Sequence, residues 1–379
     1  MNYKTFTPRQ GGNVSLSALG LGNMRLPTKE VEGNTVIDRP AATALIDLAM
    51  AKGINYFDTA YIYHGGESES FLGEALVARH PRESFFLADK YHITFCGPDY
   101  KAVFEEQLRR LQTDTIDFYL IHSVMDNTID EYLASGCIEY FEEQRRQGRI
   151  RYLGFSSHAS PEGLRRFADV HPWDFAQIQL NYLDHTLTRA GEQYEILKER
   201  NIPITVMEPV RGGRLARLND RADAFLKAAR PEFSIPAWAL RYVANLDGVQ
   251  VVLSGMSNEE QLTENIATFS AELPYLTEKD VATLFQALEM FRSDISVPCT
   301  ACRYCVERCP AGIDIPKMME VYNAYRLDGA HKLKRTARGE APSFLHCVGC
   351  GACVSGCPQS IAIPETMGEM AEKAKPFLE

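Results

Sequence analysis

Residues 55–76 read NYFDTAYIYHGGESESFLGEAL, a short apolar run followed by a helical pattern. The run NYFDTA has the length and aromatic content of a buried strand, whereas SESFLGEAL repeats apolar residues at helical spacing. The same alternation continues through the first 270 residues. The other predicted strands are SALGLGNM (17–24), FFLADK (85–90), IDFYLIHS (116–123), RYLGFSS (151–157), FAQIQLNY (175–182), IPITVMEP (202–209) and VQVVLSGM (249–256).

Eight strand–helix units at this spacing predict a parallel sheet that closes on itself, a (β/α)8 or TIM barrel of the α/β class. The helical patterns between the strands include ATALIDLAMAKG (42–53), YKAVFEEQLRRLQ (100–112) and PAWALRYVANL (236–246). The alternative is an open, doubly wound sheet. The first predicted strand is not followed by G-x-G-x-x-G, which disfavours that alternative.

Length and composition indicate a globular protein with one large domain and a small one. The chain has 379 residues, 45% of them hydrophobic and 24% charged. A net charge of −10 disfavours a nucleic-acid binder or an anionic-membrane binder, because either would need a basic surface. The first 20 residues contain no apolar signal-peptide core, and no stretch reaches the roughly 18 apolar residues of a membrane span. We therefore expect a cytoplasmic protein.

Polar or ionisable residues stand at the carboxyl ends of the predicted strands, where a barrel places its active site. Read in chain order, they are Asp58, Lys90, His122, Ser156 with Ser157, Gln179, Glu208 and Ser254. Each one alone fits a solvated loop, but so many together favour a functional site.

The stretch FDTAYIYHGGESESFLGEAL (57–76), with Lys90 and YLIHS (119–123), resembles the aldo-keto reductase family over about three quarters of the chain. The resemblance implies carbonyl reduction by a nicotinamide cofactor, with Asp58, Tyr63, Lys90 and His122 as catalytic residues. Hydride addition to a carbonyl carbon leaves negative charge on oxygen, which needs a proton donor. Tyr63 is the expected donor, and Lys90, held charged by Asp58, is expected to lower its pKa. His122 is expected to orient the carbonyl or share the proton.

The resemblance also implies residues that bind the dinucleotide. Ser156 and Ser157 occupy the place of a Ser-Asn pair that holds the nicotinamide carboxamide, and Gln179 matches a carboxamide-binding glutamine. The loop after strand seven adds Met207, Arg211 and Gly213. The loop and helix after the last strand add the expected adenosine contacts Ser254, Gly255, Met256, Asn258, Gln261, Glu264 and Asn265.

Two positions depart from the family pattern. Met207 stands where the family commonly stacks a tyrosine on the nicotinamide. Glu259 and Glu260 stand near the place of the Lys or Arg that usually pairs with the 2′-phosphate of NADP, and only Arg211 and Arg214 offer compensation. The choice among NAD, NADP and, as an alternative, FMN therefore stays open.

Two cysteine runs define a second region of the chain. CTACRYCVERCP (299–310) and CVGCGACVSGCP (347–358) share the spacing C-x2-C-x2-C-x3-C-P and hold eight of the ten cysteines, leaving Cys96 and Cys137 elsewhere. A zinc site uses four ligands and would not need two identical four-cysteine runs. Disulfide frameworks are typical of short secreted chains. The two runs therefore predict two [4Fe–4S] clusters. Each run resembles the two-cluster ferredoxins, whose fourth cysteine crosses to the other cluster. The implied ligand sets are Cys299, Cys302, Cys305 and Cys357 for one cluster, and Cys347, Cys350, Cys353 and Cys309 for the other.

We place the domain boundary near residue 294, with a barrel over 1–294 and a cluster domain over 295–379. The linker between the cysteine runs is rich in helix-forming residues, and residues 366–379 read as a terminal helix or tail, which favours a mostly helical domain. The resulting hypothesis is an iron–sulfur oxidoreductase for a small carbonyl or alcohol, whose clusters relay electrons from a ferredoxin-type donor. The alternatives are an NAD(P)H-dependent carbonyl reductase with structural clusters, and an electron-transfer or docking subunit.

Overall fold

The structure is a computed structural model that describes residues 1–9, 12–297, 299, 301, 303, 305–306, 308–357 and 361–378. Contacts divide the chain into two compact units. One comprises Met1–Ala216 with Glu232–Ala282, and the other comprises Arg217–Pro231 with Thr283–Glu379. The boundary expected near residue 294 remains a prediction.

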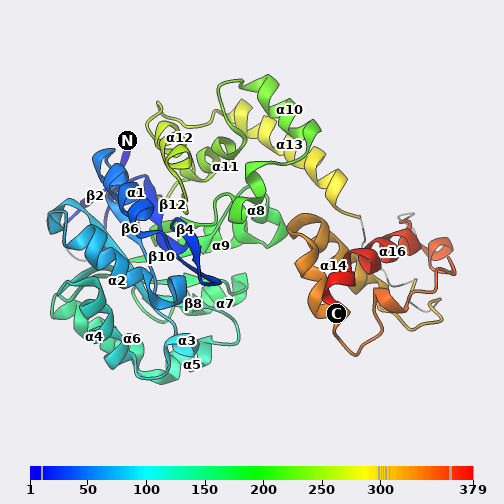
Figure 1. Cartoon of the computed structure of the whole chain (residues 1–379), viewed down its shortest axis with the longest axis horizontal. Coiled ribbons are helices and arrows are strands. Elements are labelled where there is room, and N and C mark those ends of the chain that lie inside the picture. Colours follow the sequence, from blue (N-terminus) through cyan, green and yellow to red (C-terminus); the bar gives the residue numbers. More distant parts are fainter. Residues whose placement is uncertain are drawn as a thin grey trace. The chain divides into compact units, whose positions relative to one another are not determined.

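Eight parallel strands of the first unit form a closed barrel in the order β10-β11-β12-β3-β6-β7-β8-β9 (Figure 1). Each strand coincides with one of the eight predicted runs and extends beyond it by no more than one residue, so the (β/α)8 prediction is confirmed and the open sheet is excluded. The strands are β3 (Leu19–Gly22), β6 (Tyr56–Asp58), β7 (Phe86–Tyr91), β8 (Ile116–Val124), β9 (Ile150–Ser157), β10 (Phe175–Gln179), β11 (Ile204–Met207) and β12 (Val249–Ser254).

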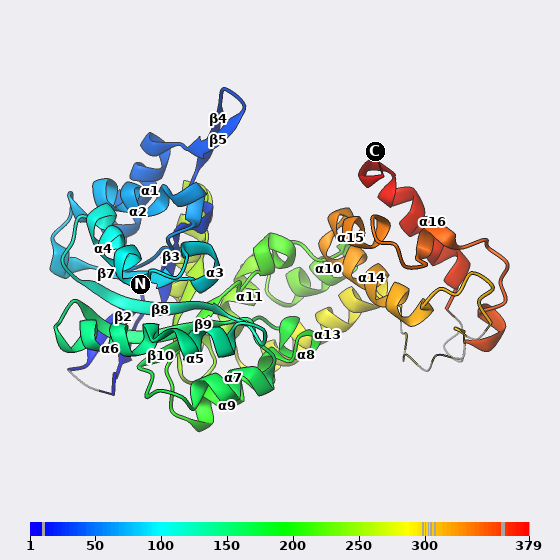
Figure 2. The same cartoon turned by 90° about the horizontal axis from the view of Figure 1, so that it is seen from below.

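A helix follows each barrel strand and covers its outer face (Figures 1 and 2). The side chains of Asp99, Ser160, Ser234 and Asn258 accept hydrogen bonds from first-turn amides and fix where four of these helices begin. The covering helices are α1 (Arg39–Ala51), α2 (Ser68–Leu72), α4 (Tyr100–Leu111), α6 (Cys137–Arg146), α7 (Pro161–Ala168), α9 (Ala190–Glu199), α11 (Ile235–Ala244) and α12 (Glu259–Phe269). The short helices α3 (Ile93–Cys96), α5 (Ile129–Ser135) and α8 (Asp184–Leu187) lie in the loops after β7, β8 and β10.

An antiparallel hairpin of β1 (Tyr3–Phe6) and β2 (Val14–Ser17) packs at the amino ends of the barrel strands. Its Phe6 ring lies 5.3 Å from the Phe118 ring and 5.0 Å from the Tyr152 ring, in edge-to-face contacts. Full burial of such a side chain contributes about 1.5–3 kcal/mol. The hairpin therefore closes this end of the barrel. A second hairpin, β4 (Thr28–Val31) with β5 (Asn34–Ile37), is largely exposed.

Helices α2 and α4 approach each other closely at Gly73, where α2 continues as the π-helical turn η3 (Gly73–Val77). A Cβ atom at position 73 would lie 2.3 Å from the backbone oxygen of Arg110 on α4. Only glycine permits this approach without a shift of the backbone.

The described residues from 283 onward contain helices and short turns but no strand, which confirms a mostly helical second domain. Its helices are α13 (Glu278–Ile295, whose first residues belong to the first unit), α14 (Ile315–Asp328), α15 (Lys334–Ala337) and α16 (Ile363–Ala374), and α10 (Asp220–Ala229) belongs to the same unit. Helix α16 begins three residues before the predicted terminal helix. Buried Ile313, Met319, Phe344, Ile363 and Met367 form the centre of a small core. Along the described chain, no helix combines the length and the apolar character needed to cross a membrane.

Candidate functional site

A cavity of about 480 Å³ lies at the carboxyl ends of the barrel strands. Of the four predicted catalytic residues, Asp58, Tyr63 and His122 line it, and Lys90 is fully buried in contact with Asp58. Asp58 ends β6, Tyr63 begins the turn that follows, and Lys90 and His122 lie near the ends of β7 and β8. The barrel therefore brings all four residues together, although their catalytic roles remain predictions.

Lys90 and Asp58 form a buried ion pair. The Lys90 Nζ atom lies 2.6 Å from Asp58 Oδ1, and it donates a second hydrogen bond of 2.6 Å to the backbone oxygen of Thr59. Burial of the ammonium is the largest single influence and acts to lower the Lys90 pKa, but the charge and hydrogen bond of Asp58, together with Tyr63 and Asp89, outweigh it, so the pKa is raised. Lys90 is therefore held in its charged form.

Tyr63 lies against this ammonium. Lys90 Nζ is 5.1 Å from the centre of the Tyr63 ring. Burial of the phenol raises the Tyr63 pKa, and the charge of Lys90 offsets only part of that effect, so the net direction is upward. The charge of Lys90 does act to lower the Tyr63 pKa, as expected. The effect of burial is larger, so the expected net decrease is wrong. Tyr63 therefore remains protonated at neutral pH, as a proton donor must be.

His122 stays neutral beside Tyr63. Its ring centre lies 6.2 Å from that of Tyr63 and 5.4 Å from that of His92. Burial, followed by the positive charge of Lys90, places the His122 pKa well below its usual range. The Tyr132 hydroxyl donates to the backbone oxygen of His122 at 2.6 Å and fixes the end of β8. A neutral imidazole at this point can orient a carbonyl oxygen by a hydrogen bond.

Most of the predicted dinucleotide contacts line the same cavity. They are Met207, Gly213, Ser254, Gly255, Met256, Gln261, Glu264 and Asn265. Asn265 Nδ2 donates to Ser254 Oγ at 3.1 Å and ties α12 to the end of β12. Gln177 Oε1 and Glu264 Oε1 are buried among the described atoms without a hydrogen-bond partner. Unpaired polar atoms in a cavity wall fit a site that holds a polar ligand.

The remaining predicted contacts are bonded within the protein and do not line the cavity. Ser123 N donates to Ser156 Oγ at 2.7 Å, and Ala159 N donates to Ser157 Oγ at 3.1 Å. Asn258 accepts from Gln261 N and caps α12.

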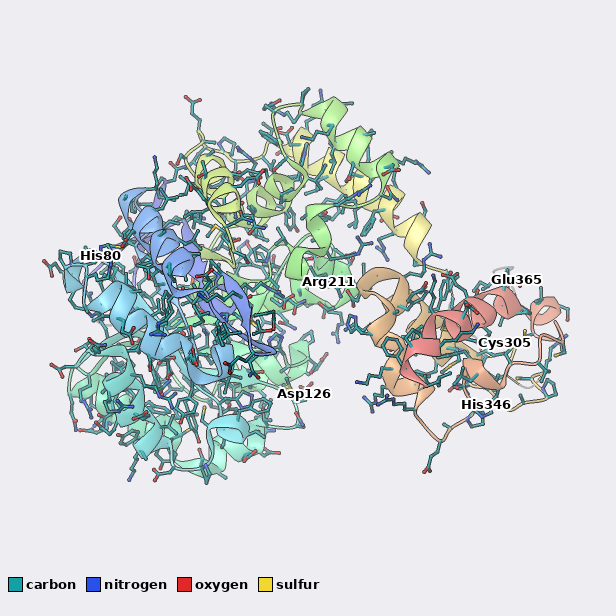
Figure 3. All side chains as sticks on the ribbon, viewed as in Figure 1. His80, Asp126, Arg211, Cys305, His346 and Glu365 are labelled. Carbon is teal, nitrogen blue, oxygen red and sulfur yellow. The ribbon has the colours of Figure 1, made fainter. Side chains whose placement is uncertain are left out.

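Gln179 and Arg211 belong to a second group of these internal contacts. Gln179 Nε2 donates to Asp184 at 2.8 Å, and Arg211 Nε (Figure 3) lies 3.1 Å from both oxygens of the same carboxylate. Arg211 is therefore committed to an ion pair. The roles of all these residues in cofactor binding remain predictions.

Sequence reasoning missed several residues of the cavity wall. Arg25, His92, His158 and Gln177 line it. Gln177 stands two residues before Gln179, so strand periodicity places both on one face of β10. Arg25 follows the first strand in GLGNMR, in a strand-end position like those of the predicted residues. Strand periodicity and position at a strand end therefore indicate both residues.

A second cavity lies in the helical domain and is lined by four cysteines from both runs. Cys309 of the first run joins Cys347, Cys350 and Cys353 of the second, with Ile313, Ile363 and Met367 around them. Burial raises the Cys353 pKa, and the charges of Cys347, Cys350 and Cys309 raise it further. Four thiols in an apolar pocket fit the donor set of a [4Fe–4S] cluster, and the crossed grouping is the one that the two-cluster pattern implies.

The other predicted ligand set is partly described. Cys305, labelled in Figure 3, is buried, Cys299 and Cys357 are half-buried, and Cys302 lies outside the described residues. Arg308 donates to Ser355 Oγ at 3.3 Å and joins the two runs close to Cys309 and Cys357. Among the described cysteines, none is joined in a disulfide.

Comparison with known proteins agrees with both halves of the chain. Residues 18–289 match the aldo/keto reductase family, and residues 298–362 match a 4Fe-4S dicluster domain. An uncharacterised oxidoreductase of Bacillus subtilis, YqkF, is 28% identical over 305 residues, which cover 72% of this chain and 92% of that protein. The NADH-specific methylglyoxal reductase of Escherichia coli is 24% identical over 322 residues, covering 73% and 97%.

A solved structure shows the same barrel. The holo form of aldo-keto reductase AKR11C1 from Bacillus halodurans superposes with a TM-score of 0.62 at 28% identity, covering 76% of this chain and 96% of that one. The family match extends over more than half of the chain and coincides with the closed barrel and its strand-end cavity. The protein is therefore an oxidoreductase of the aldo/keto reductase family with a 4Fe-4S dicluster domain in its C-terminal part.

Proposed function

We propose that the barrel interconverts a small carbonyl compound and its alcohol, with a nicotinamide cofactor and with Tyr63 as the proton donor. The observation that carries this proposal is the group Asp58, Lys90, Tyr63 and His122 at the cavity wall. The name of the Escherichia coli relative, an NADH-specific methylglyoxal reductase, supports a small carbonyl substrate.

Each of the four residues has its own role in the proposed reaction. A bound nicotinamide supplies or accepts the hydride. Tyr63 donates its phenolic proton to the carbonyl oxygen, and Lys90 stabilises the phenolate that remains. Neutral His122 donates a hydrogen bond that orients the same oxygen. Asp58 keeps Lys90 charged in a site where burial alone would favour the neutral amine.

The cavity wall after β12 suits the far end of the dinucleotide. The amino end of α12, whose first turn carries Glu259 and Glu260, faces that part of the site. Two carboxylates oppose a 2′-phosphate, and Arg211 is already paired with Asp184, so the proposed cofactor is NADH rather than NADPH. The FMN alternative gains no support from the comparisons.

Replacement of one hydroxyl tests this function. Tyr63→Phe is expected to lower kcat by about 10²–10⁴-fold with methylglyoxal and NADH, while NADH binding and iron content stay unchanged. Tyr61→Phe is the matched control, because its hydroxyl only accepts a weak bond from Arg110 at 3.4 Å. A Tyr63→Phe variant with the kcat of the wild type would refute the assignment.

For the helical domain we propose a second function, relay of single electrons from a ferredoxin-type donor. The supporting observation is the second cysteine cavity, where Cys350 is exposed and Val348 is 72% exposed. An exposed ligand and an apolar neighbour give a partner access to the cluster edge, and [4Fe–4S] clusters carry one electron at a time. The rival is a purely structural role for the clusters.

Electron relay is tested by comparing two reductants. Cys350→Ser is expected to abolish reduction of the second cluster by reduced ferredoxin and to leave NADH-driven turnover near the wild-type rate. Cys96→Ser, a thiol outside both runs, is the control. Parallel loss of both activities with local unfolding would favour the structural role. A wild-type protein that accepts no electrons from ferredoxin would contradict the relay.

A further inference from the structure

A cluster of polar side chains is buried behind the active site, between strand β7 and helices α2 and α4. Glu69, Asp89, Gln107 and Tyr119 each have 0% of their surface exposed. Asp89 and Lys90 are consecutive on β7, so Lys90 points into the barrel and Asp89 points outward against the helices. This layer is normally apolar, and a polar cluster there needs a reason.

Gln107 on α4 is the centre of the cluster. Its Nε2 atom lies 3.0 Å from Glu69 Oε1, 2.8 Å from Asp89 Oδ2 and 3.0 Å from the backbone oxygen of Lys90. Its Oε1 atom accepts from the Tyr119 hydroxyl at 2.5 Å. An amide has two hydrogens, so Gln107 satisfies at most two of its three acceptors at one time.

The cluster holds the backbone of Lys90 on both sides. Asp89 Oδ1 accepts from Lys90 N at 2.8 Å, and Gln107 reaches the Lys90 oxygen. The close approach of α2 and α4 at Gly73 brings Glu69 and Gln107 into this layer. The cluster therefore sets the position from which Lys90 reaches Asp58 and Tyr63.

The charges do not balance if both carboxyl groups are ionised. Glu69 Oε2 is 3.0 Å from Arg110 Nη1, but Arg110 is shared with Glu106 on α4 at 2.8 Å. Glu69 and Asp89 meet at one amide nitrogen, because Gln107 Nε2 lies 3.0 Å from Glu69 Oε1 and 2.8 Å from Asp89 Oδ2. Two buried carboxyl groups this near to each other, with one shared arginine as counter-charge, are stabilised when one of them holds a proton.

We propose that Glu69 and Asp89 form a buried carboxyl pair that shares one proton, with Asp89 kept neutral as a positioning residue for Lys90. Burial raises the pKa of Glu69 as well, but Arg110 contacts Glu69 and favours its charged form, so Glu69 is the member of the pair that stays ionised. Burial, followed by the charge of Glu69, raises the Asp89 pKa well above its usual range, in agreement with this arrangement.

A neutral Asp89 matters for the chemistry of the site. Its negative charge would raise the pKa values of both Tyr63 and Lys90. When Asp89 is neutral, Asp58 is the close counter-charge of Lys90, and the ammonium retains its pull on the Tyr63 phenol. The titratable groups that face Asp89 from the surrounding elements are Glu69, Lys90, Tyr63, Cys96, Arg110 and Tyr119.

Infrared spectroscopy of the purified full-length holoprotein tests the shared proton without any assay of activity. At neutral pH, the wild type minus Asp89→Asn difference is expected to show the C=O band of a protonated carboxylic acid. Asparagine reproduces the shape and the donor of neutral Asp89, so the variant should fold. If that difference shows a carboxylate band in place of the acid band, Asp89 is ionised in the wild type and the proposal is overturned. Glu69→Gln gives a second measurement, in which Asp89 should ionise in place of Glu69, so the acid band should disappear while the number of carboxylates stays the same.

The pH profile tests the role in positioning, and this part rests on the proposed function. The reaction to follow is oxidation by NAD⁺ of the alcohol formed from methylglyoxal, whose kcat is expected to rise with pH. The pH at the midpoint of this rise, the alkaline limb, should be the same in Asp89→Asn as in the wild type. Glu69→Gln should move it up by about one pH unit, because Asp89 then ionises beside Arg110. Glu106→Gln, which alters the same arginine without touching the pair, should not move it.

The two measurements separate the possible failures. A limb that moves to lower pH in Asp89→Asn would show that Asp89 was charged and would overturn the proposal. An unmoved limb in Glu69→Gln would overturn the effect on Tyr63. Absence of turnover in all proteins would count against the proposed function alone, because the infrared result decides the proton independently.

Discussion

The barrel site and the cysteine cavity are built in opposite ways. In the barrel, the protein supplies both partners of each important contact, such as the 2.6 Å pair of Lys90 with Asp58. In the helical domain, four thiols from both cysteine runs line the second cavity, and they are donors of one kind that suit a metal cluster. The first site is held together by side chains that bond to one another. The second is a set of like donors that a bound cluster would hold together.

This difference predicts two kinds of stability. The barrel core contains interlocking aromatic rings such as Phe118, whose centre lies 4.9–5.3 Å from those of Phe6, Tyr56, Tyr152 and Phe175. The helical domain has a small core in which Cys305 and Cys353 are themselves buried members. Below a certain size a domain needs cross-links or metals to fold, so we expect this domain to depend on its clusters.

Removal of iron is expected to have the largest effect. The anaerobic protein should contain about eight irons. After chelation, hydrogen exchange over residues 299–361 should rise to the level of an unfolded chain, while β7 and β8 keep their protection. Equal protection with and without iron would break the comparison, because the small core would then suffice. Stoichiometric zinc without acid-labile sulfide would contradict the cluster assignment itself.

Lys90→Met should have the next largest effect, and it is confined to the barrel. The change leaves the Asp58 carboxylate buried without its partner, which is expected to cost about 3–5 kcal/mol in the free energy of unfolding. The double variant Asp58→Leu with Lys90→Met removes both charges and should recover much of this loss. Urea unfolding measures both. A single variant as stable as the wild type would show that the pair is not a buried ion pair.

A smaller effect is expected at Asn258, which was predicted to contact adenosine and caps α12 in the structure. Asn258→Ala should lower the free energy of unfolding by about 0.5–2 kcal/mol, because the amide of Gln261 loses its acceptor. The Kd for NADH distinguishes the two roles. An unchanged Kd supports the cap alone, and a weaker Kd supports an additional contact with the cofactor. Asn219→Ala, which caps α10 in the other unit, is the control.

The smallest effect is the response of carbonyl reduction to pH. Tyr63 acts in its protonated form, and burial raises its pKa, so it stays protonated throughout the neutral range. His122 is neutral there because burial lowers its pKa. We expect kcat for reduction to be flat from about pH 6 to about pH 9, and kcat for the reverse oxidation to rise with pH. A fall in the reduction rate centred near neutral pH would mean that His122, not Tyr63, donates the proton.

The sequence predicted the barrel and the polar residues at its strand ends, Asp58, Lys90 and His122 among them, because both follow from local rules. Strand length, helix period and the position of a residue at the carboxyl end of a strand are visible in the letters. The family resemblance then added Tyr63, which no periodicity singles out. The crossed cysteine grouping came from the resemblance to two-cluster ferredoxins, and the structure places Cys309 with the second run as that resemblance implies.

What the sequence could not predict depends on burial and on partners far along the chain. The Tyr63 pKa rises because the phenol is enclosed, and enclosure is a property of the fold. Glu69 and Gln107 are 38 residues apart and meet only because α2 and α4 pack closely. The family resemblance points to Gln179 as a cofactor contact. In the structure, the Gln179 amide bonds to Asp184, and Gln177 is the glutamine that lines the cavity.

The hairpin of β1 and β2 has a consequence for the start of the chain. Phe6 and Leu16 belong to one buried cluster with Tyr56, Phe118 and Phe175 of the barrel strands. The first residues of the sequence therefore share a core with strands that lie far along the chain. Separation of this hairpin from the barrel would expose those aromatic rings to water at the end opposite the cavity.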